Sequence, residues 1–516
     1  MTARVPVLIS GGGIAGLTTA LLLRREGVYP VLVEKHAGVS PQPKARRFNP
    51  RSTEVFRLLG LAAEVAEASA PLASFSAVLA GPTLVAAQAR DMSGMRERRL
   101  QQARIPELSP GPNVLCPQVV LEPILRRAAE ERGVSVRLGT ELVSFTQDGD
   151  GVTALLKPAD GEPYKLTADY LVAADGARSP VRTALGIPRG GHGHLADNLD
   201  LYFRADLTGL AREKPFNLCE IDNPVASGAF LSVNGTDRWL FSTADFPEAR
   251  TLGDGDWHDL LRIVIGVPDL DVELLSRSPW ESAMRVADRF RDGRVFLTGD
   301  AAHMMPPMAA AGANTAIADA ANLAWKLAAV LAGRAAPALL DTYDAERRPA
   351  GYAIAEASST VRGHVGDMLA AYTSPDRRHD DLLATMFGTQ YTEGAFVPDG
   401  RDPAPVDHYA PAGRPGTRLP HAWIDARTST VDYAGPGLTL LTGPDNGHWI
   451  TEADRLGLRL VEVPHQGWLA ETCLPADGAL LVRPDVIVAW HSASATPLAE
   501  AVQWVLGTAV ASAQPQ

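Results

Sequence analysis

The first 34 residues alternate between short apolar runs and turns. Residues 5–10 (VPVLIS) form an apolar run of strand length, and residues 14–25 form a longer apolar run of helical length. A third apolar run, residues 30–33, ends at Glu34. Three glycines of the segment GGGIAG separate the first two runs. This pattern predicts a strand, a tight glycine-rich turn, a helix and a second strand in that order.

The next part of the chain mixes helical and strand patterns. Residues 51–66 and 119–132 have apolar positions at helical spacing, which predicts two helices. The segment between them, residues 80–113, is polar, contains proline and glycine, and favours no assignment. From residue 134 to 172, short β-type runs alternate with turn signals such as DGDG, and this pattern indicates an antiparallel meander.

The middle of the chain favours a sheet. Residues 190–290 hold several alternating runs, including LDLYFRADL and DRWLFSTADF, that suit a sheet-based domain. Strand and helix patterns then resume at residues 294–299 and 314–332, and residues 337–364 predict a long helix. We therefore place the middle sheet domain at residues 191–290, where it interrupts a domain whose two parts are residues 1–190 and 291–395.

The C-terminal part has its own αβ pattern. Proline and glycine are frequent in residues 397–420, which is typical of a linker or a domain entry. Beyond it, we expect four strands and a helix at residues 437–442, 458–463, 479–483, 486–490 and 496–506. These elements predict a compact domain within residues 396–516.

Composition narrows the class of protein. With 516 residues the chain is long for one core, and its 46% apolar and 21% charged residues are ordinary for a globular protein. The net charge of −12 argues against nucleic acid or an anionic membrane as partner. No window approaches eighteen unbroken apolar residues, so we expect no membrane span. The three cysteines, Cys116, Cys219 and Cys473, lie far apart, which favours a reducing cytoplasm.

The glycine turn at the N-terminus has the features of a dinucleotide cradle. Gly11 permits the tight turn, Gly13 leaves room for a pyrophosphate, and Gly16 lets the helix pack close to the strand. The helix N-terminus offers N–H groups and partial positive charge to phosphates. Glu34 can accept hydrogen bonds from a ribose 2′-OH. These features together favour a segment that binds an adenine dinucleotide over a glycine-rich turn without a ligand.

Two later segments extend this motif. LVAADGARSPVR (171–182) is an apolar run that ends at Asp175, and GRVFLTGDAAHMMPP (293–307) is another that ends at Asp300. With GGGIAG they resemble the three fingerprints of the FAD-dependent aromatic hydroxylases, the single-component flavoprotein monooxygenases. The resemblance continues through residues 314–331 and 341–351. It implies an α/β fold with a Rossmann-like FAD-binding domain and a middle substrate-binding sheet.

The resemblance also implies roles for individual residues. Glu34 would bind the adenosine ribose, Gln118 the ribityl–phosphate region, and Asp300 a ribityl hydroxyl. The family usually places an arginine in the segment that corresponds to PKARRFNPRSTE (43–54), for which Arg46 is our candidate and Lys44 the alternative. We expect His303 to be structural. The full set of expected cofactor-binding residues is Gly11, Gly13, Ile14, Ala15, Gly16, Glu34, Lys35, Arg46, Gln118, Asp175, Asp300, Pro307, Gly312, Ala313 and Asn314.

One departure from the family concerns the loop after Pro307. The family pattern PPxGGxGxN has two adjacent glycines, whereas this chain reads PPMAAAGAN and keeps only Gly312. Those glycines let the backbone adopt positive φ beside the flavin, which costs an alanine about 1–2 kcal/mol. We therefore expect FAD binding to persist, with an altered position or mobility of the flavin ring.

The C-terminal segments GRPGTRLPHAWI (413–424) and GALLVRPDVIVAW (478–490) resemble the thioredoxin-like domain of phenol-type and aromatic-polyketide hydroxylases. Because Cys473 has no CxxC partner, this domain would be structural, for example a dimer or lid surface. The sequence leaves a homodimer open.

The reaction implied by the resemblance uses FAD, NAD(P)H and O2. Reduced FAD and O2 would form a C4a-hydroperoxide that hydroxylates a small aromatic molecule, a phenolic or quinonoid polyketide. The sequence identifies no catalytic residue. Phe230, Trp239 and Phe241 alternate at strand spacing and are candidates to line the pocket. A flavin oxidase or reductase, a Baeyer–Villiger-type oxygenase and a degenerate non-catalytic flavoprotein remain as alternatives.

Overall fold

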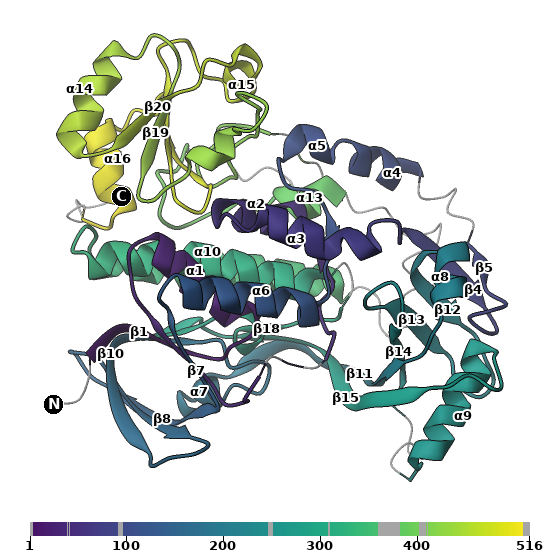
Figure 1. Cartoon of the computed structure of the whole chain (residues 1–516). Helices are drawn as coiled ribbons and strands as arrows, with labels where there is room; N and C mark the ends of the chain where they lie inside the picture. The colour runs from purple at the N-terminus through teal and green to yellow at the C-terminus, as the bar shows by residue number, and fades with distance from the viewer. Residues whose placement is uncertain are drawn as a thin grey trace.

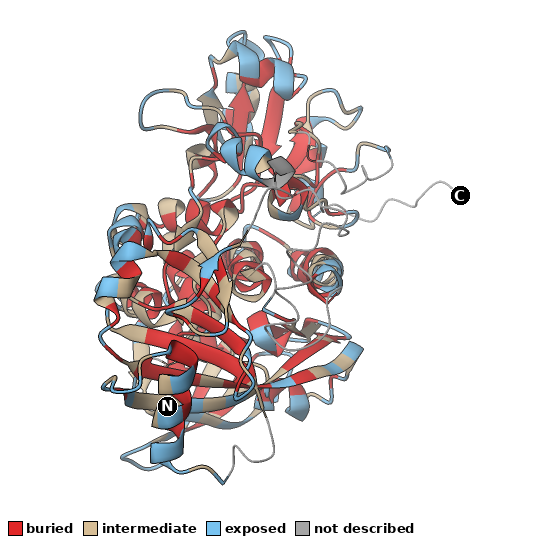
Figure 2. Ribbon diagram, turned by 90° about the vertical axis from the view of Figure 1, so that its right-hand side faces the viewer, coloured by how far each residue is buried: buried red, intermediate tan, exposed pale blue. Residues whose placement is uncertain are grey.

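The computed structural model describes residues 4–38, 40, 42–90, 96–245, 251–307, 310–359, 382–401, 409 and 411–508. Its strands form two eight-stranded sheets, a four-stranded sheet in the C-terminal part, and a two-stranded ribbon of β3 (Arg47–Phe48) and β6 (Val114–Leu115). Figure 1 shows the two large sheets side by side and the C-terminal part above the first. Figure 2 shows that buried positions run through the strands of the sheets.

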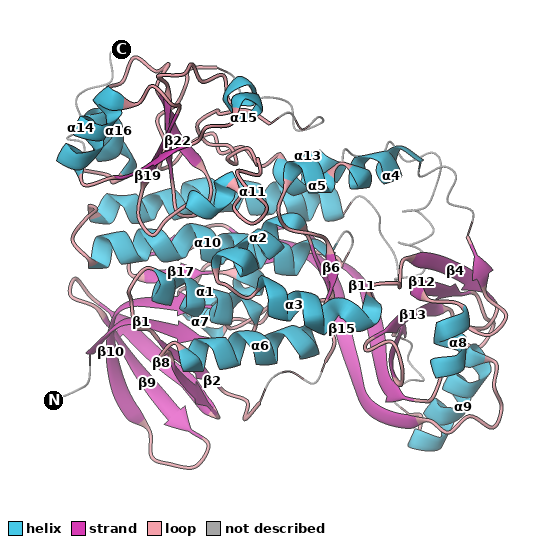
Figure 3. Ribbon diagram, turned by 45° about the horizontal axis from the view of Figure 1, so that its top comes forward, coloured by secondary structure: helices cyan, strands magenta, loops and turns pink. Residues whose placement is uncertain are grey.

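The first sheet has a parallel centre. Its strand order is β16-β17-β10-β1-β2-β7, and β1 pairs in parallel with both β10 and β2. Figure 3 shows α1, α6 and α10 over one side of this sheet. The strands and helices of this layer are β1 (Arg4–Ser10), β2 (Val31–Glu34), β7 (Ser135–Leu138), β8 (Thr140–Gln147), β9 (Val152–Pro158), β10 (Tyr164–Ala173), β16 (Arg291–Asp292), β17 (Val295–Leu297), α1 (Ile14–Arg25), α6 (Gln118–Glu131) and α10 (Ala311–Leu331).

The expected antiparallel meander is only partly present. β8, β9 and β10 pair antiparallel, but β7 joins the first sheet in parallel beside β2, and β10 pairs in parallel with β1. The helix expected over 51–66 is also divided, into α2 (Pro50–Leu58) and α3 (Ala62–Ser69). Gly60 causes this break because its φ of 69° cannot continue a right-handed helix.

The second sheet has the order β18-β15-β11-β14-β13-β12-β4-β5. It contains β4 (Ala77–Gly81) and β5 (Gln88–Ala89), so the expectation that residues 191–290 build this layer by themselves needs correction. Segment 80–113 contributes the end of β4 and the short β5 to this sheet, and β4 has its parallel partner in β12, far along the chain. The other elements of this layer are β11 (Arg189–Arg204), β12 (Phe216–Ile221), β13 (Gly228–Ser232), β14 (Arg238–Ala244), β15 (Glu273–Ala287), β18 (His303–Met304), α8 (Thr208–Glu213) and α9 (Asp254–Ile265).

The two faces of this second sheet have different neighbours. One face packs Phe203, Phe230 and Trp239 against Trp257 and Leu261 of α9 in a closed apolar cluster. On the other face, Tyr202 and Leu240 pack near Val119 of α6, and Gln42 donates a hydrogen bond to Ser276 Oγ at 2.7 Å. The second face is therefore directed toward the first layer, and we call it the inner face.

The C-terminal part has the thioredoxin-like arrangement that the sequence predicts. Its sheet order is β20-β19-β21-β22, with β19 parallel to β20 and antiparallel to β21. The elements are β19 (Thr439–Thr442), α14 (Gly447–Leu456), β20 (Arg459–Glu462), α15 (Gln466–Glu471), β21 (Ala479–Val482), β22 (Val488–His491) and α16 (Leu498–Val505).

Buried charges join this C-terminal part to the first layer. Arg483 contacts Glu346 of α11 (Asp341–Ser358) through Nη1 and Oε1 at 2.7 Å, and Lys326 Nζ reaches Glu346 Oε2 at 2.9 Å. Arg418 pairs with Glu54 of α2. These side chains are almost fully enclosed, so each ion pair must be satisfied internally. The expected helix over 337–364 consists of a 3₁₀ turn, Pro337–Leu340, and then α11, and its last five expected positions, 360–364, lie outside the described residues.

Candidate functional site

The glycine turn between β1 and α1 has the tight geometry that its sequence predicts. Gly11 has a φ of 113°, and a Cβ there would overlap the carbonyl oxygen of Ala174 in the neighbouring chain segment. A Cβ at Gly16 would overlap the carbonyl oxygen of Gly11. Gly13 has more open space, since its Cβ would lie 3.5 Å from Glu122 Oε1. Gly11 and Gly16 therefore serve the protein's own packing, and Gly13 leaves an approach to the N-terminus of α1.

Glu34 lies at the end of β2 and faces this turn. Its Oε2 accepts a hydrogen bond from the Gly12 N–H at 2.8 Å, and its Oε1 accepts one from the His36 N–H at 2.9 Å. The next residue, Lys35, is exposed. The carboxylate is thus fixed beside the glycine turn, where the sequence predicts an adenosine ribose.

The segments around Asp175 and Asp300 lie together at the ends of neighbouring parallel strands. Gly299 packs against α1 and α10, because a Cβ on it would lie 3.0 Å from Ala15 Cβ and 3.2 Å from Ala316 Cβ. The Arg182 side chain donates from Nη1 to the Ala301 carbonyl at 3.0 Å, which ties the first of these segments to the second. The structure thereby brings together the three sequence motifs.

The two aspartates have different surroundings. Asp175 Oδ2 accepts a hydrogen bond from the Val181 N–H at 3.0 Å, which holds the start of the short helix that follows, while Oδ1 has no described partner. The described residues give the Asp300 carboxylate no hydrogen bond. Burial raises the pKa of the Asp175 carboxyl group. Asp300 is exposed, and desolvation by the protein around it raises the pKa of its carboxyl group as well. Asp300 is therefore the free acceptor that a ribityl hydroxyl requires.

The loop before α10 has the strain that its alanines predict. Ala310 has a φ of 54°, a left-handed conformation that favours glycine, and it precedes the first residue of the helix. Met308 and Ala309 lie outside the described residues, so the expectation for Ala309 stays a prediction. Pro307 is exposed, and Gly312 and Ala313 lie in the first turn of α10.

Asn314 fastens this helix to the rest of the layer. Its Oδ1 accepts hydrogen bonds from the Asn49 N–H at 2.9 Å and from Ser52 Oγ at 2.6 Å, and its Nδ2 donates to the Ala310 carbonyl at 2.7 Å. Asn314 therefore positions the N-terminus of α10, which has no side-chain cap of its own.

Gln118 and Arg46 lie where the two-stranded ribbon meets α6. Gln118 Oε1 accepts from the Ala45 N–H at 3.2 Å, and its Nε2 donates to Glu122 Oε1 at 2.6 Å. Arg46 Nη1 donates to the Asn217 carbonyl of the second sheet at 2.7 Å, while its Nε and Nη2 are buried without a described partner. Burial, together with neighbouring Arg47, lowers the pKa of Arg46 to about 9.

Three carboxyl groups from different parts of the chain interact electrostatically with Lys44. Desolvation by the surrounding protein raises the pKa of Glu122 on α6, Asp200 on β11 and Asp300, and the charge of Lys44 opposes that rise at each of them. Sequence reasoning missed Glu122 and Asp200. Glu122 could have been found from its position one helical turn after Gln118. Asp200 could have been found as an acidic residue in an otherwise apolar run of strand type.

The expectation that Phe230, Trp239 and Phe241 line the pocket is corrected by the structure. All three are fully buried in the cluster that faces α9, and none is on the inner face. Alternation at strand spacing showed that they share a face, but the sequence did not reveal which face looks toward the first layer.

His303 is buried in a charged network. Its Nε2 lies 2.7 Å from Asp319 Oδ2, and the other Asp319 oxygen accepts from Arg347 Nε at 2.8 Å. Asp319 Oδ2 also accepts the Gly299 N–H at 3.1 Å. His303 therefore supports the backbone beside Asp300, in keeping with the structural role expected of it.

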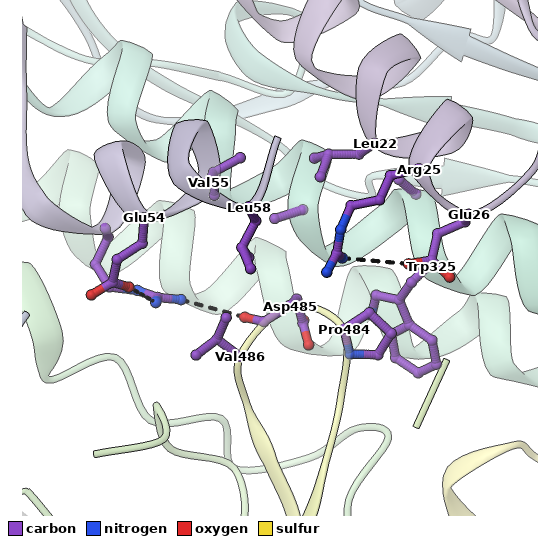
Figure 4. A pocket seen from close by; sticks show the side chains of 13 residues that line it. Leu22, Arg25, Glu26, Glu54, Val55, Leu58, Trp325, Pro484, Asp485 and Val486 are labelled. Carbon is purple, nitrogen blue, oxygen red and sulfur yellow. Dashed lines mark hydrogen bonds and ion pairs between the residues drawn. The ribbon is translucent and has the colours of Figure 1, made fainter. Parts of the chain in front are cut away.

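A small cavity lies between α1, α2, α10 and the loop at 484–486 (Figure 4). Arg25, Glu26, Glu54, Trp325 and Asp485 are among its lining residues. Its volume of about 10 Å³ is that of one water, so it holds no substrate.

Comparisons with known proteins agree with this geometry. Residues 4–358 match the family described as FAD binding domain, and residues 412–509 match the family described as aromatic-ring hydroxylase, C-terminal. The chain belongs to the FAD-dependent aromatic-ring hydroxylases.

Relatives and solved structures of this family cover nearly the whole chain. The tetracenomycin A2 monooxygenase-dioxygenase of Streptomyces glaucescens is 38% identical, over 95% of this chain and 94% of its own. An aklavinone 12-hydroxylase of Streptomyces purpurascens is 36% identical, over 98% of each chain. The crystal structure of aklavinone-11 hydroxylase with FAD and aklavinone has a TM-score of 0.85 and 34% identity, and the match covers 98% of this chain and 100% of that one.

FAD is the cofactor of this hydroxylase, and the residues present suit it. The N-termini of α1 and α10 have no side-chain cap and can offer N–H groups to phosphate or flavin oxygens. The carboxylates of Glu34 and Asp300 can accept hydrogen bonds from hydroxyl groups of FAD, and the amide of Gln118 can both donate and accept. Ile14 and Ala15 form the first turn of α1 beside Gly13. Among the described residues, no helix is long and apolar enough to cross a membrane.

Proposed function

We propose that the protein hydroxylates a phenolic or quinonoid, polyketide-type aromatic compound with O2 and electrons from NAD(P)H. The observation that carries the proposal is the joining of the three FAD motifs at one edge of the first sheet, opposite the inner face of the second sheet. Relatives named for tetracenomycin and aklavinone support the substrate class. Bound FAD would take electrons from NAD(P)H and transfer one oxygen atom of O2 to the substrate.

The residues of this chain would bind FAD, orient the substrate and shield both from water. The glycine turn and Glu34 would hold the adenosine end of FAD, Asp300 would hold its ribityl chain, and the N-terminus of α10 would stabilise negative charge on the flavin. The inner face of the second sheet would cover the substrate and exclude water, which limits wasteful formation of hydrogen peroxide. Arg46, with two unpartnered nitrogens, is proposed to face an anionic group of the cofactor.

The thioredoxin-like part is proposed to be structural. Cys473 is exposed, and the other two cysteines, Cys116 and Cys219, are buried elsewhere. The buried ion pairs of Arg418 and Arg483 fix this part on α2 and α11.

The test is turnover by the purified holoenzyme. NAD(P)H oxidation should depend on a polycyclic phenol and should yield an oxygenated product identified by mass spectrometry. Oxidation of NAD(P)H that yields hydrogen peroxide alone, across a broad panel of phenols, would favour a flavin oxidase. Ring insertion of oxygen in the product would favour a Baeyer–Villiger-type reaction.

A further inference from the structure

Asp200 is a carboxylate on the inner face of the second sheet. In the antiparallel register it pairs with Ser242 of β14 and Ser278 of β15, and directly paired residues share a face. Two positions along β11, Tyr202 packs near Val119 of α6. Since side chains at i and i+2 of a strand point the same way, Asp200 is directed toward the FAD-binding layer.

Two neighbouring strands hold one oxygen of this carboxylate. Asp200 Oδ1 accepts a hydrogen bond from Ser242 Oγ at 2.6 Å and another from Trp280 Nε1 at 2.9 Å. The described residues provide no hydrogen bond to Oδ2. The group is therefore oriented through one oxygen and has its second oxygen free for a ligand.

No described cation forms an ion pair with Asp200. Lys44 is the charged group whose field reaches it, and the same lysine acts on Glu122 and Asp300 beside the cofactor motifs. Burial raises the pKa of Asp200, and the hydrogen bonds from Ser242 and Trp280 and the charge of Lys44 oppose that rise. A partly buried carboxylate without an ion pair destabilises the fold, which is a frequent sign of a functional group.

We propose that Asp200 accepts the proton of a phenolic or enolic hydroxyl of the substrate, in an orientation fixed by Ser242 and Trp280. The substrate O–H bond breaks, the proton moves to Asp200 Oδ2, and the electron pair stays on the substrate oxygen. The resulting phenolate is a more electron-rich ring for oxygen transfer, and the proton later returns to the oxygenated product. This inference rests on the proposed function and adds the catalytic base that the sequence could not locate.

The test compares D200N with the parent holoenzyme, using a hydroxyanthraquinone as the probe substrate. For a general base, we expect kcat/KM to fall about 100-fold near neutral pH. FAD content and the rate of flavin reduction by NAD(P)H should be unchanged. Activity of D200N should recover as the pH approaches the pKa of the free phenol, because the probe then ionises without help. The exposed neighbour Asp197 supplies the matched control, D197N, with parental activity expected.

A second variant guards against a merely structural effect. The Ser242 hydrogen bond lowers the pKa of Asp200, so S242A should move the acidic limb of the kcat/KM profile to higher pH. Because Trp280 still holds the carboxylate, the plateau of S242A should fall less than that of D200N. Parental activity in D200N, or a loss that is equal at every pH, would overturn the proposal for Asp200. Absence of an oxygenated product from the parent enzyme with every phenol tested would instead contradict the proposed function, and the proposal for Asp200 with it.

Discussion

The alanine at position 310 provides a sharp test of how the loop before α10 is built. Its φ of 54° lies in the left-handed region, where an L-residue with a Cβ is destabilised by about 1–2 kcal/mol relative to glycine. Glycine also gains about 0.4–1 kcal/mol of conformational freedom in the unfolded chain. The difference leaves A310G more stable than the parent by roughly 0.5–1 kcal/mol.

Ala311, one residue later, is the matched control. It is the first residue of α10 and is 9% exposed. The same loss of a methyl group there removes buried apolar surface and helix propensity, so A311G should be less stable by about 1 kcal/mol. The two neighbouring alanine-to-glycine changes are therefore expected to have opposite signs.

The assay is urea unfolding of the FAD-loaded protein at a fixed excess of FAD, followed by tryptophan fluorescence and by release of flavin fluorescence. A310G should raise the urea midpoint, and A311G should lower it. Stopped-flow reduction by NAD(P)H then tests whether the loop controls the position of the flavin ring: the rate should change in A310G. Equal destabilisation by both variants would refute the assigned backbone conformation. An unchanged reduction rate would restrict the effect to stability.

Three further predictions concern the cofactor and the buried charges. D300A removes a free acceptor, so FAD should bind about 1–3 kcal/mol more weakly by equilibrium titration, whereas unchanged affinity would remove Asp300 from the site. E346Q takes from Lys326 its carboxylate and leaves Arg483 with Asp485 alone, so it should lower the free energy of unfolding by about 3–5 kcal/mol. The exposed helix neighbour variant E356Q should stay near parental, and equal effects would contradict the network. Burial raises the pKa of Glu346, but Arg483 and Lys326 outweigh it and hold the pKa below its ordinary value of 4.5, so the unfolded chain takes up this proton first and stability should fall as the pH drops below 4.5. The urea midpoint of E346Q should change less steeply over that range, and an identical slope would contradict this assignment.

Local patterns allowed the cofactor half of the site to be predicted. β1, α1 and β2 follow the apolar runs of the first 34 residues within one residue at each end. Gly11 and Gly16 have close backbone neighbours of the kind that the motif requires. These elements and the glycine turn depend on residues near one another in sequence, so the local sequence pattern was enough to predict them.

The substrate half could not be predicted in the same way. Its position depends on which face of the second sheet looks toward the first layer, and alternation gives two equivalent faces. The aromatic residues Phe230, Trp239 and Phe241 pack against α9, whereas Asp200 faces inward. β4 and the Glu346 network likewise depend on partners far along the chain, which only the folded structure brings together.

The most direct test of the central claim is oxygen incorporation from ¹⁸O2 by the purified yellow protein. With NAD(P)H and a polycyclic phenol, we expect bound FAD and a hydroxylated product that carries ¹⁸O from O2. A colourless protein that takes up no added FAD, or a product whose new oxygen comes from water, would show that the protein is not an FAD-dependent hydroxylase.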